Sequence, residues 1–351
     1  MDQATTATRG RHANSLNLVR LVLATAVLVS HARITAGLEE PVIRGDSVGA
    51  WAVACFFVVS GYLIAESRYR LPLGTYLLHR FARIMPAYWV CLVVTGLLAI
   101  TCFAGTLPLG ELVSGALRYA GSNAFLVQQQ GGIAGTPSGI AYPGEWNASL
   151  WTLAHEMACY LVLGAVAVLT PRHRARLVFL AVWLGSVLAL VALPHVIAEP
   201  PLLLSQFARL APYFFGGVVV QFVLPMERMT AALSAVAATG FVGLELLDPR
   251  WGSQLAAPLL AVALLGLSRV LPSPAVIRRH DISYGVYIYA FPFSQALAVA
   301  GLEEPWPVYL ALVLLLTGAA ATASWLLLER RVLRWARSRP ARRARMPEPS
   351  V

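Results

Sequence analysis

The sequence predicts an all-α protein that crosses a membrane several times, and three observations lead to this fold class. Hydrophobic residues make up 58% of the 351 residues and charged residues only 13%, whereas soluble globular domains contain about 25% charged residues. The mean hydropathy is +0.67. Several apolar stretches are about 20 residues long, which is enough to cross a bilayer as helices. Fibrous, disordered and disulfide-stapled classes are therefore excluded.

Hydropathy predicts about ten membrane-spanning helices. They lie near residues 16–36, 50–66, 84–104, 149–169, 176–193, 206–224, 229–247, 254–271, 282–300 and 306–328. We expect residues 1–335 to form one membrane-embedded domain and residues 336–351 to form a basic, unstructured cytoplasmic tail. The connection at 105–148 is the one long loop, and loops of that length are usually functional or disordered.

The arginines predict the orientation in the membrane. All 27 basic residues are arginine, and 21 of them fall at the chain ends or in the alternate connections on the same side as the ends. Basic residues accumulate in cytoplasmic loops, so both termini are predicted to be cytoplasmic and the protein to be a multi-pass protein of the cell (inner) membrane. The net charge of +10 then reflects topology and contact with membrane lipids, and no nucleic-acid partner is expected.

The first predicted span contains two ionisable residues, Arg20 and His31. Such residues are costly inside a membrane and are therefore functional candidates. Helical geometry places them on one face, about 16 Å apart along the axis. Asn17 extends this face by one turn. The alternatives are an arginine that reaches the membrane surface and a histidine that is hydrogen-bonded in the core.

The fourth predicted span contains Glu156. This span enters from the outside, so Glu156 is expected at a depth similar to that of His31. A carboxylate beside an imidazole would orient a general base or stabilise its cation. The alternative is an ion pair that holds two helices together.

Two short motifs lie near these spans. Ser60-Gly61 lies in the second span, and small residues there usually permit close approach of helices. Arg80 and Arg83 lie in a short cytoplasmic segment before the third span and share one face. Paired guanidinium groups are suited to phosphate recognition, and anchoring of the topology is the alternative.

Several other classes of site are absent from the sequence. It contains no Gly-rich phosphate loop and no G-x-S-x-G nucleophile turn. The four cysteines lie in or beside apolar stretches without metal-ligand spacing, so we expect structural thiols and no metal. The N-terminus does not resemble a cleavable signal peptide.

Taken in order, six segments resemble the integral-membrane type-3 acyltransferases, which O-acylate carbohydrates. The segments are Arg-x10-His at Arg20 and His31, Phe-Phe-x-x-Ser-Gly-aromatic-Leu at Phe56–Leu63, Arg-x-x-Arg-Ile-x-Pro at Arg80–Pro86, Ser-Leu-Trp-Thr-Leu-x-x-Glu at Ser149–Glu156, Arg-x-x-Pro-Tyr-Phe-x-x-Gly at Arg209–Gly216 and Ser-Tyr-Gly-x-Tyr at Ser283–Tyr287. Each segment alone is a weak signal, but the six together cover most of the chain. About ten helices and cytoplasmic termini agree with this family.

The resemblance implies transfer of an acyl group, most often acetyl from cytoplasmic acetyl-CoA, to a sugar hydroxyl. It implies that His31 is the catalytic histidine, as general base or acyl carrier, with Arg20 as its motif partner and Glu156 as support. Arg80 and Arg83 would hold the phosphates of CoA. Substrate-binding or structural roles fall to the other motif residues, which are Asn17, Ser60, Gly61, Trp151, Tyr160 and Tyr284.

The sequence departs from the family pattern at two places. Many relatives have proline where this chain has Ala154-His155, and many have histidine where it has Ala290. The second departure resembles an exopolysaccharide-modifying subgroup, and we expect no fused esterase-like domain. We therefore expect direct transfer to a lipid-linked sugar or a surface polysaccharide.

Two alternatives to this activity stay open at the level of sequence. The first is acylation of a glycosylated small natural product such as a macrolide. The second is a secondary transporter in which the same ionisable residues relay protons or bind a substrate. Transporters often contain internal repeats and broken helices, and the sequence shows neither.

Overall fold

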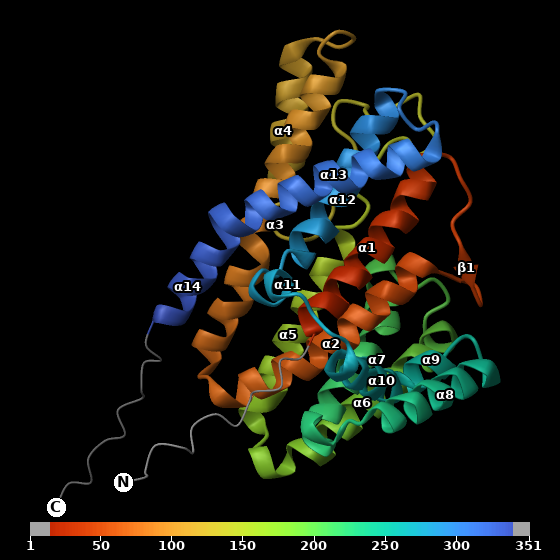
Figure 1. Cartoon of the computed structure of the whole chain (residues 1–351), viewed down its shortest axis with the longest axis vertical. Helices are drawn as coiled ribbons and strands as arrows, with labels where there is room; N and C mark the ends of the chain where they lie inside the picture. The colour runs from red at the N-terminus through yellow and green to blue at the C-terminus, as the bar shows by residue number, and fades with distance from the viewer. Residues whose placement is uncertain (1–14, 340–351) are drawn as a thin grey trace, which may run out of the picture.

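The computed structural model describes residues 15–339. Within them the chain is built almost entirely from helices (Figure 1). The long helices are α1 (Leu16–Thr35), α2 (Val48–Arg70), α3 (Leu73–Phe103), α5 (Trp151–Leu169), α6 (Ala175–Val196), α7 (Leu202–Val223) and α13 (Trp306–Ser324). Shorter helices are α4 (Leu109–Ser122), α8 (Ala231–Leu247), α9 (Gly252–Leu255), α10 (Ala257–Val270), α11 (Ala275–Arg279), α12 (Ser283–Val299) and α14 (Arg330–Ser338). The strands β1 (Val42–Ile43) and β2 (Asp46–Ser47) form a small hairpin.

The predicted all-α, membrane-spanning fold is confirmed. Among the described residues, seven helices are long and apolar enough to cross a membrane, with α13 and α14 counted as one continuous span. Each of the ten predicted stretches coincides with a helix. Seven of them are the long helices, and the other three correspond to the shorter helices α8, α10 and α12. The orientation of the termini stays a prediction. Arg9 and Arg11 lie outside the described residues, as does the predicted tail beyond residue 339.

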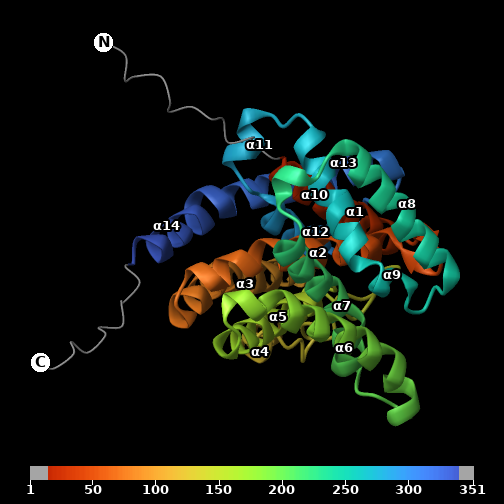
Figure 2. The ribbon, with the colours of Figure 1, turned by 90° about the horizontal axis from the view of Figure 1, so that it is seen from below.

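Helix α1 lies in the middle of the bundle, where it packs against α2 and α12 (Figures 1 and 2). Helix α2 also packs closely on α7, α12 on α13, and α8 on α10, while α6 covers the outer side of α7. Apolar side chains on these shared faces form one hydrophobic core. The ionisable residues of α1 therefore lie in the interior of the bundle, between its neighbours, rather than on its lipid-facing rim.

Two glycines permit the close crossing of α2 and α7. A Cβ atom at Gly61 would lie 1.9 Å from the carbonyl oxygen of Phe214, and one at Gly217 would lie 2.0 Å from the carbonyl oxygen of Val58. Any larger residue would force the helices apart. The close-approach interpretation of the Ser60-Gly61 motif therefore holds for Gly61.

Two boundaries differ from the sequence predictions. Helix α3 begins at Leu73, so Arg80 and Arg83 lie inside a continuous helix of 31 residues and not in a segment before it. At about 1.5 Å per residue this helix exceeds the thickness of the hydrocarbon core, so its first turns extend beyond the core. Helix α14 continues to Ser338, beyond the predicted domain boundary at 335. His79 contacts the carbonyl oxygen of Ala336 at 3.2 Å and so joins α14 to α3.

The predicted long loop is ordered. Its first part forms α4, which packs along α3. The remainder is held to α12, because Asn147 donates to the carbonyl oxygen of Ile288 (2.9 Å). Gln295 donates to the carbonyl oxygens of Tyr142 and Glu145 (2.7 Å each). These contacts fix the loop over the end of α1 that contains His31.

Candidate active site

Six arginines line a cavity of about 430 Å³ at the N-terminal end of α1, which we call the arginine cavity. They are Arg20, Arg80, Arg83, Arg278, Arg279 and Arg337, and the carboxylates that share the lining are Glu156 and Asp281. The formal charge of the lining is therefore strongly positive. Such a cavity is suited to a ligand with several negative charges.

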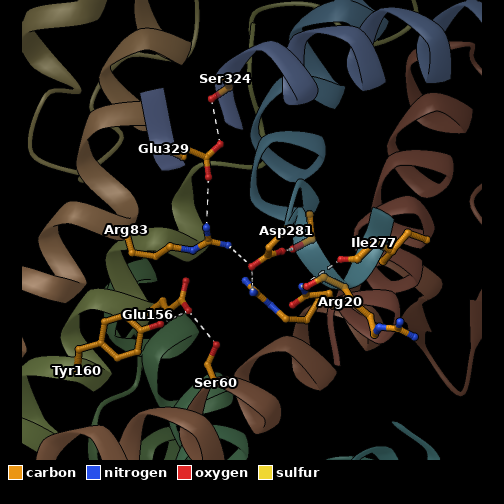
Figure 3. A network of polar contacts seen from close by, with 12 residues as sticks. Arg20, Ser60, Arg83, Glu156, Tyr160, Ile277, Asp281, Ser324 and Glu329 are labelled. Carbon is orange, nitrogen blue, oxygen red and sulfur yellow. Dashed lines mark hydrogen bonds and ion pairs between the residues drawn. The ribbon is translucent and has the colours of Figure 1, made fainter. Parts of the chain in front are cut away.

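Asp281 joins two of the predicted site residues (Figure 3). It precedes α12 and forms an ion pair with Arg20 of α1 and another, at 2.7 Å, with Arg83 of α3. Ser283 donates a hydrogen bond to its second oxygen (2.6 Å). Burial alone would raise the pKa of the Asp281 carboxyl, but the guanidinium groups of Arg20 and Arg83 outweigh burial and hold this pKa well below its usual range. Asp281 therefore stays ionised and fixes both arginines.

Arg83 has a second carboxylate partner. Glu329 lies 3.3 Å from the other terminal nitrogen of Arg83 and accepts a hydrogen bond from Ser324 (3.0 Å) (Figure 3). Glu329 is the last residue of a π-helical turn between α13 and α14, Trp325–Glu329. Turns of this kind are often found at functional sites.

Arg80 differs from Arg83, although the two are one helical turn apart. Its guanidinium group lies over the ring of Tyr160, 5.7 Å from the centroid. It forms no ion pair with any residue between 15 and 339, and its Nε is buried without a partner there. Arg80 therefore has free hydrogen-bonding capacity for an anionic ligand, whereas Arg83 is already paired.

Glu156 lies at a narrow neck that leads away from the arginine cavity. It accepts hydrogen bonds from Ser60 of α2 (3.0 Å) and from Tyr160. A space of about 50 Å³ at this level is lined by Glu156 and Arg20 on one side and by Thr152 and Tyr287 on the other. The first two also line the arginine cavity, and the last two line the space around His31. The neck thus lies between two larger spaces.

His31 lies where two adjoining cavities of about 450 and 480 Å³ meet, at the C-terminal end of α1. We call them together the histidine cavity. The Nδ1 atom of His31 is 3.2 Å from the hydroxyl oxygen of Ser149, and the rings of His31 and Phe291 pack edge-to-face with their centroids 5.1 Å apart. Trp151 lines both cavities. An imidazole held in this way at a cavity wall is placed to accept or donate a proton.

The structure brings Ser149, and not Glu156, into contact with His31, while Glu156 contacts Ser60 and Tyr160. Ser149 and Glu156 are seven residues apart, which corresponds to about 10 Å along the helix axis. Glu156 is therefore two turns nearer the arginine cavity, at the level of Ser60 and Tyr160. The similar depth expected for the two side chains is not what the structure has, since α5 begins at Trp151 and Ser149, two residues before it, already lies at the level of His31.

The other motif residues have structural contacts. Asn17 donates to the carbonyl oxygens of Ile277 and Arg278 (3.1 and 3.2 Å) and so joins α1 to α11. Tyr284 donates to the carbonyl oxygen of Ile84 (2.8 Å) under the guanidinium group of Arg83. His155, at the departure from the family pattern, contacts the carbonyl oxygens of Trp151 and Leu203. It therefore links α5 to the start of α7.

Sequence reasoning missed Asp281 and Glu329. Neither residue lies in the helix of the arginine with which it pairs. One signal was available, because an acidic residue directly before a helix is typical of a helix N-terminus. Nothing in the sequence indicated that Arg20 and Arg83 would share this carboxylate.

Comparison with known proteins decides the class of this site. The family model described as "Acyltransferase domain" matches residues 13–328. The chain belongs to this acyltransferase family. It is 30% identical to a protein named "O-acetyl transferase" from Shigella phage Sf6, over 80% of this chain and 85% of that protein. It is 26% identical to "Nodulation protein 10" from Rhizobium leguminosarum bv. viciae, over 95% of this chain and 96% of that protein. No solved structure matches.

Family membership distinguishes between the classes that the sequence left open. The protein is a multi-pass membrane acyltransferase, and the secondary-transporter alternative loses its basis. The family match begins before α1 and ends within the π-helical turn. It includes the histidine cavity, the neck and the lining of the arginine cavity except Leu333 and Arg337.

Proposed function

We propose that this acyltransferase moves an acetyl group from acetyl-CoA to a hydroxyl group of a saccharide. The observation that supports this most strongly is the arrangement along α1. An arginine-lined cavity lies at one end, His31 at the other, and a narrow neck between them. A donor with a polyphosphate head and a long thin arm has the shape that this arrangement accommodates.

The arginine cavity is the proposed site for the CoA phosphates. Arg80 has unused donors, and Arg278, Arg279 and Arg337 add positive charge at the lining. Guanidinium–phosphate pairs are among the strongest hydrogen bonds that proteins form. Arg20 and Arg83 are already paired with Asp281. We therefore assign phosphate binding first to Arg80 and give Arg83 a positioning role. Since arginines favour the cytoplasmic side, this cavity would open to the cytoplasm.

His31 is the proposed catalytic residue. The thioester of the donor would reach it through the neck, past Arg20 and Glu156. His31 accepts the proton of the acceptor hydroxyl as the oxygen attacks the thioester carbonyl carbon. The C–O bond of the ester forms, the C–S bond breaks, and the proton passes from His31 to the departing CoA thiolate. Ser149 holds the imidazole from the Nδ1 side, which leaves Nε2 for the acceptor.

The acceptor is proposed to be a lipid-linked sugar or a polysaccharide. The printed name of the phage relative supports O-acetyl transfer, and the size of the histidine cavity suits a ligand of the size of a sugar unit or larger.

Purified protein with acetyl-CoA labelled in the acetyl group tests the proposal. With a polysaccharide fraction from the source cells, we expect label in the carbohydrate as a base-labile ester, with equimolar release of CoA. Mass spectrometry of surface polysaccharide from a deletion strain should show loss of the same ester. Label that stays in acetyl-CoA, with unchanged polysaccharide in the deletion strain, would contradict a saccharide acceptor.

A further inference from the structure

The charges that line the histidine cavity differ in sign from those of the arginine cavity. Three carboxylates line it, those of Glu40, Asp46 and Glu145, together with one guanidinium group, that of Arg209. Arg209 and Asp46 form an ion pair with each other. Glu40 and Glu145 are left without a cationic partner within the described part of the chain. The lining therefore has an excess of negative charge.

Glu40 reaches this cavity from the segment between α1 and β1. Its Oε1 atom lies close to the start of α2, since a Cβ atom built on Gly49 would be 3.3 Å from it and 2.6 Å from the hydroxyl of Ser30. Ser30 precedes His31, so this carboxylate lies beside the turn that contains the imidazole. Glu40 has no hydrogen bond or ion pair with any residue from 15 to 339. A partly buried carboxylate without a partner is stabilised by a bound hydrogen-bond donor or by water.

Glu145 lines the other half of the cavity and is fixed by neutral groups. Gln128 donates to one carboxylate oxygen (2.8 Å) and Tyr142 to the other (3.3 Å). Gln295 holds its backbone carbonyl (2.7 Å). These donors orient the carboxylate without cancelling its charge. The two unpaired carboxylates thus lie in the two halves of one cavity, with His31 where the halves meet.

We infer that this cavity binds an acceptor whose groups beside the reacting hydroxyl are uncharged or cationic, as in a neutral sugar or an amino sugar, and that it excludes a carboxylate or phosphate there. The inference rests on the proposed function, because it takes His31 as the place where the acceptor is acylated. Carboxylates accept hydrogen bonds from hydroxyl and ammonium groups. They repel anions strongly where water is partly excluded. Any phosphate of a lipid-linked acceptor then lies outside the cavity.

Charged thiol reagents measure the sign of the field without any acceptor. Gln206 lines both halves of the histidine cavity, and Leu63 lines the arginine cavity. Gln206→Cys and Leu63→Cys are made with the partly buried Cys55 and Cys102 changed to Ser. Detergent-solubilised protein is treated with a cationic or an anionic methanethiosulfonate, and labelling is followed by intact-protein mass spectrometry. Each labelling rate is divided by the rate at which the same reagent reacts with a small free thiol in solution.

We expect Gln206→Cys to react on the order of tenfold faster with the cationic reagent, and Leu63→Cys to show the opposite preference. Adding Glu40→Gln and Glu145→Gln should bring the ratio of the cationic to the anionic labelling rate at position 206 close to one. An equal or anionic preference at Gln206→Cys would overturn the inference, whatever the acceptor of the enzyme is.

A pair of polymers tests the same inference by transfer. A polysaccharide that contains uronic acids is compared with the same polysaccharide after carboxyl reduction, using labelled acetyl-CoA. We expect a kcat/KM at least about tenfold higher for the reduced polymer, since like charges in an interface suppress wrong partners. Glu40→Gln with Glu145→Gln should narrow this difference. Preference for the acidic polymer overturns the inference. Transfer to neither polymer counts against the proposed saccharide acceptor, while the reagent ratios still decide the charge of the cavity.

Discussion

The two ends of α1 differ in how their polar groups are held. At the N-terminal end, Arg20 and Arg83 share Asp281 in a cluster of ion pairs inside a positively charged cavity. At the C-terminal end, His31 contacts one neutral hydroxyl and one aromatic ring, and unpaired carboxylates line the cavity. Ion pairs hold the arginine side chains in place when a charged ligand binds beside them. Neutral contacts hold the imidazole but leave it free to accept and donate a proton. Under the proposed function, donor binding and proton transfer are therefore separate tasks at the two ends of one helix.

A smaller contrast exists within the arginine cavity. Arg83 has two carboxylate partners and Arg80 has none among the described residues, although one motif contains both. A paired arginine supports the structure, and an unpaired one keeps its donors for a ligand. The same residue type at a spacing of three thus has two different environments.

The largest effect is expected at the histidine end. His31→Ala should lower the rate of transfer by at least about 10²–10⁴-fold, because it removes the group that accepts the hydroxyl proton. Steady-state assays with labelled acetyl-CoA measure this loss. His195→Ala, at an exposed histidine outside both cavities, is the control and should transfer normally. Near-normal transfer by well-folded His31→Ala protein would remove His31 from the mechanism.

At the arginine end, Asp281→Asn should act mainly on stability. It leaves Arg20 and Arg83 partly buried without their shared carboxylate, and breaking such a pair costs about 3–5 kcal/mol. Thermal unfolding in detergent measures the effect. Asp248→Asn, which breaks the exposed pair with Arg250, is the matched control and should cost no more than about 1 kcal/mol.

The contribution of the Asp281 carboxylate to stability depends on pH in a way that follows from its lowered pKa. A carboxyl with a depressed pKa stabilises the folded protein at every pH above the unfolded value of about 3.9, and the contribution is lost only as the pH falls through the folded pKa. The difference in stability between wild type and Asp281→Asn should therefore stay constant from pH 8 to pH 5. A difference that shrinks already at pH 6 would contradict the assignment.

Comparison of Arg80→Ala with Arg83→Ala sharpens the contrast within the arginine cavity. Arg80→Ala should weaken CoA binding about 10–100-fold without loss of stability, since charge-assisted hydrogen bonds contribute about 1.5–3 kcal/mol. Arg83→Ala should lower stability as well, because Asp281 and Glu329 lose their partner. Titration of CoA and dephospho-CoA shows whether Arg80 contacts the phosphate that dephospho-CoA lacks. Equal CoA affinity and equal stability of the two variants would contradict the different roles assigned to Arg80 and Arg83.

A smaller effect is expected for Glu156→Gln. The amide still accepts hydrogen bonds from Ser60 and Tyr160, and the charge that it removes is about 10 Å from the level of His31. We expect the rate to fall less than about tenfold and the pH–rate profile to keep its shape, because only a near carboxylate raises the pKa of an imidazole strongly. A shift of the profile by a full unit would show that Glu156 approaches His31 during turnover.

The sequence was informative where function depends on one helix. The spacing of Arg20 and His31 placed both on one face of α1, and each of the ten stretches that hydropathy predicts coincides with a helix, because these features follow from local periodicity. The pairing of Arg20 and Arg83 through Asp281 could not be predicted, since the three residues come from α1, α3 and the start of α12. The depth of Glu156 in the bundle could not be predicted for a similar reason. It depends on where α5 begins relative to α1, and helix boundaries are the least predictable feature of a sequence.

The separation of donor binding from proton transfer is tested most directly by the dissociation constant of CoA, measured by titration of purified His31→Ala and Arg80→Ala in the same detergent. We expect His31→Ala to bind CoA as tightly as the wild type although it transfers nothing, and Arg80→Ala to bind it at least about tenfold more weakly. Loss of CoA affinity in His31→Ala, together with unchanged affinity in Arg80→Ala, would place the donor at the histidine end and contradict the separation.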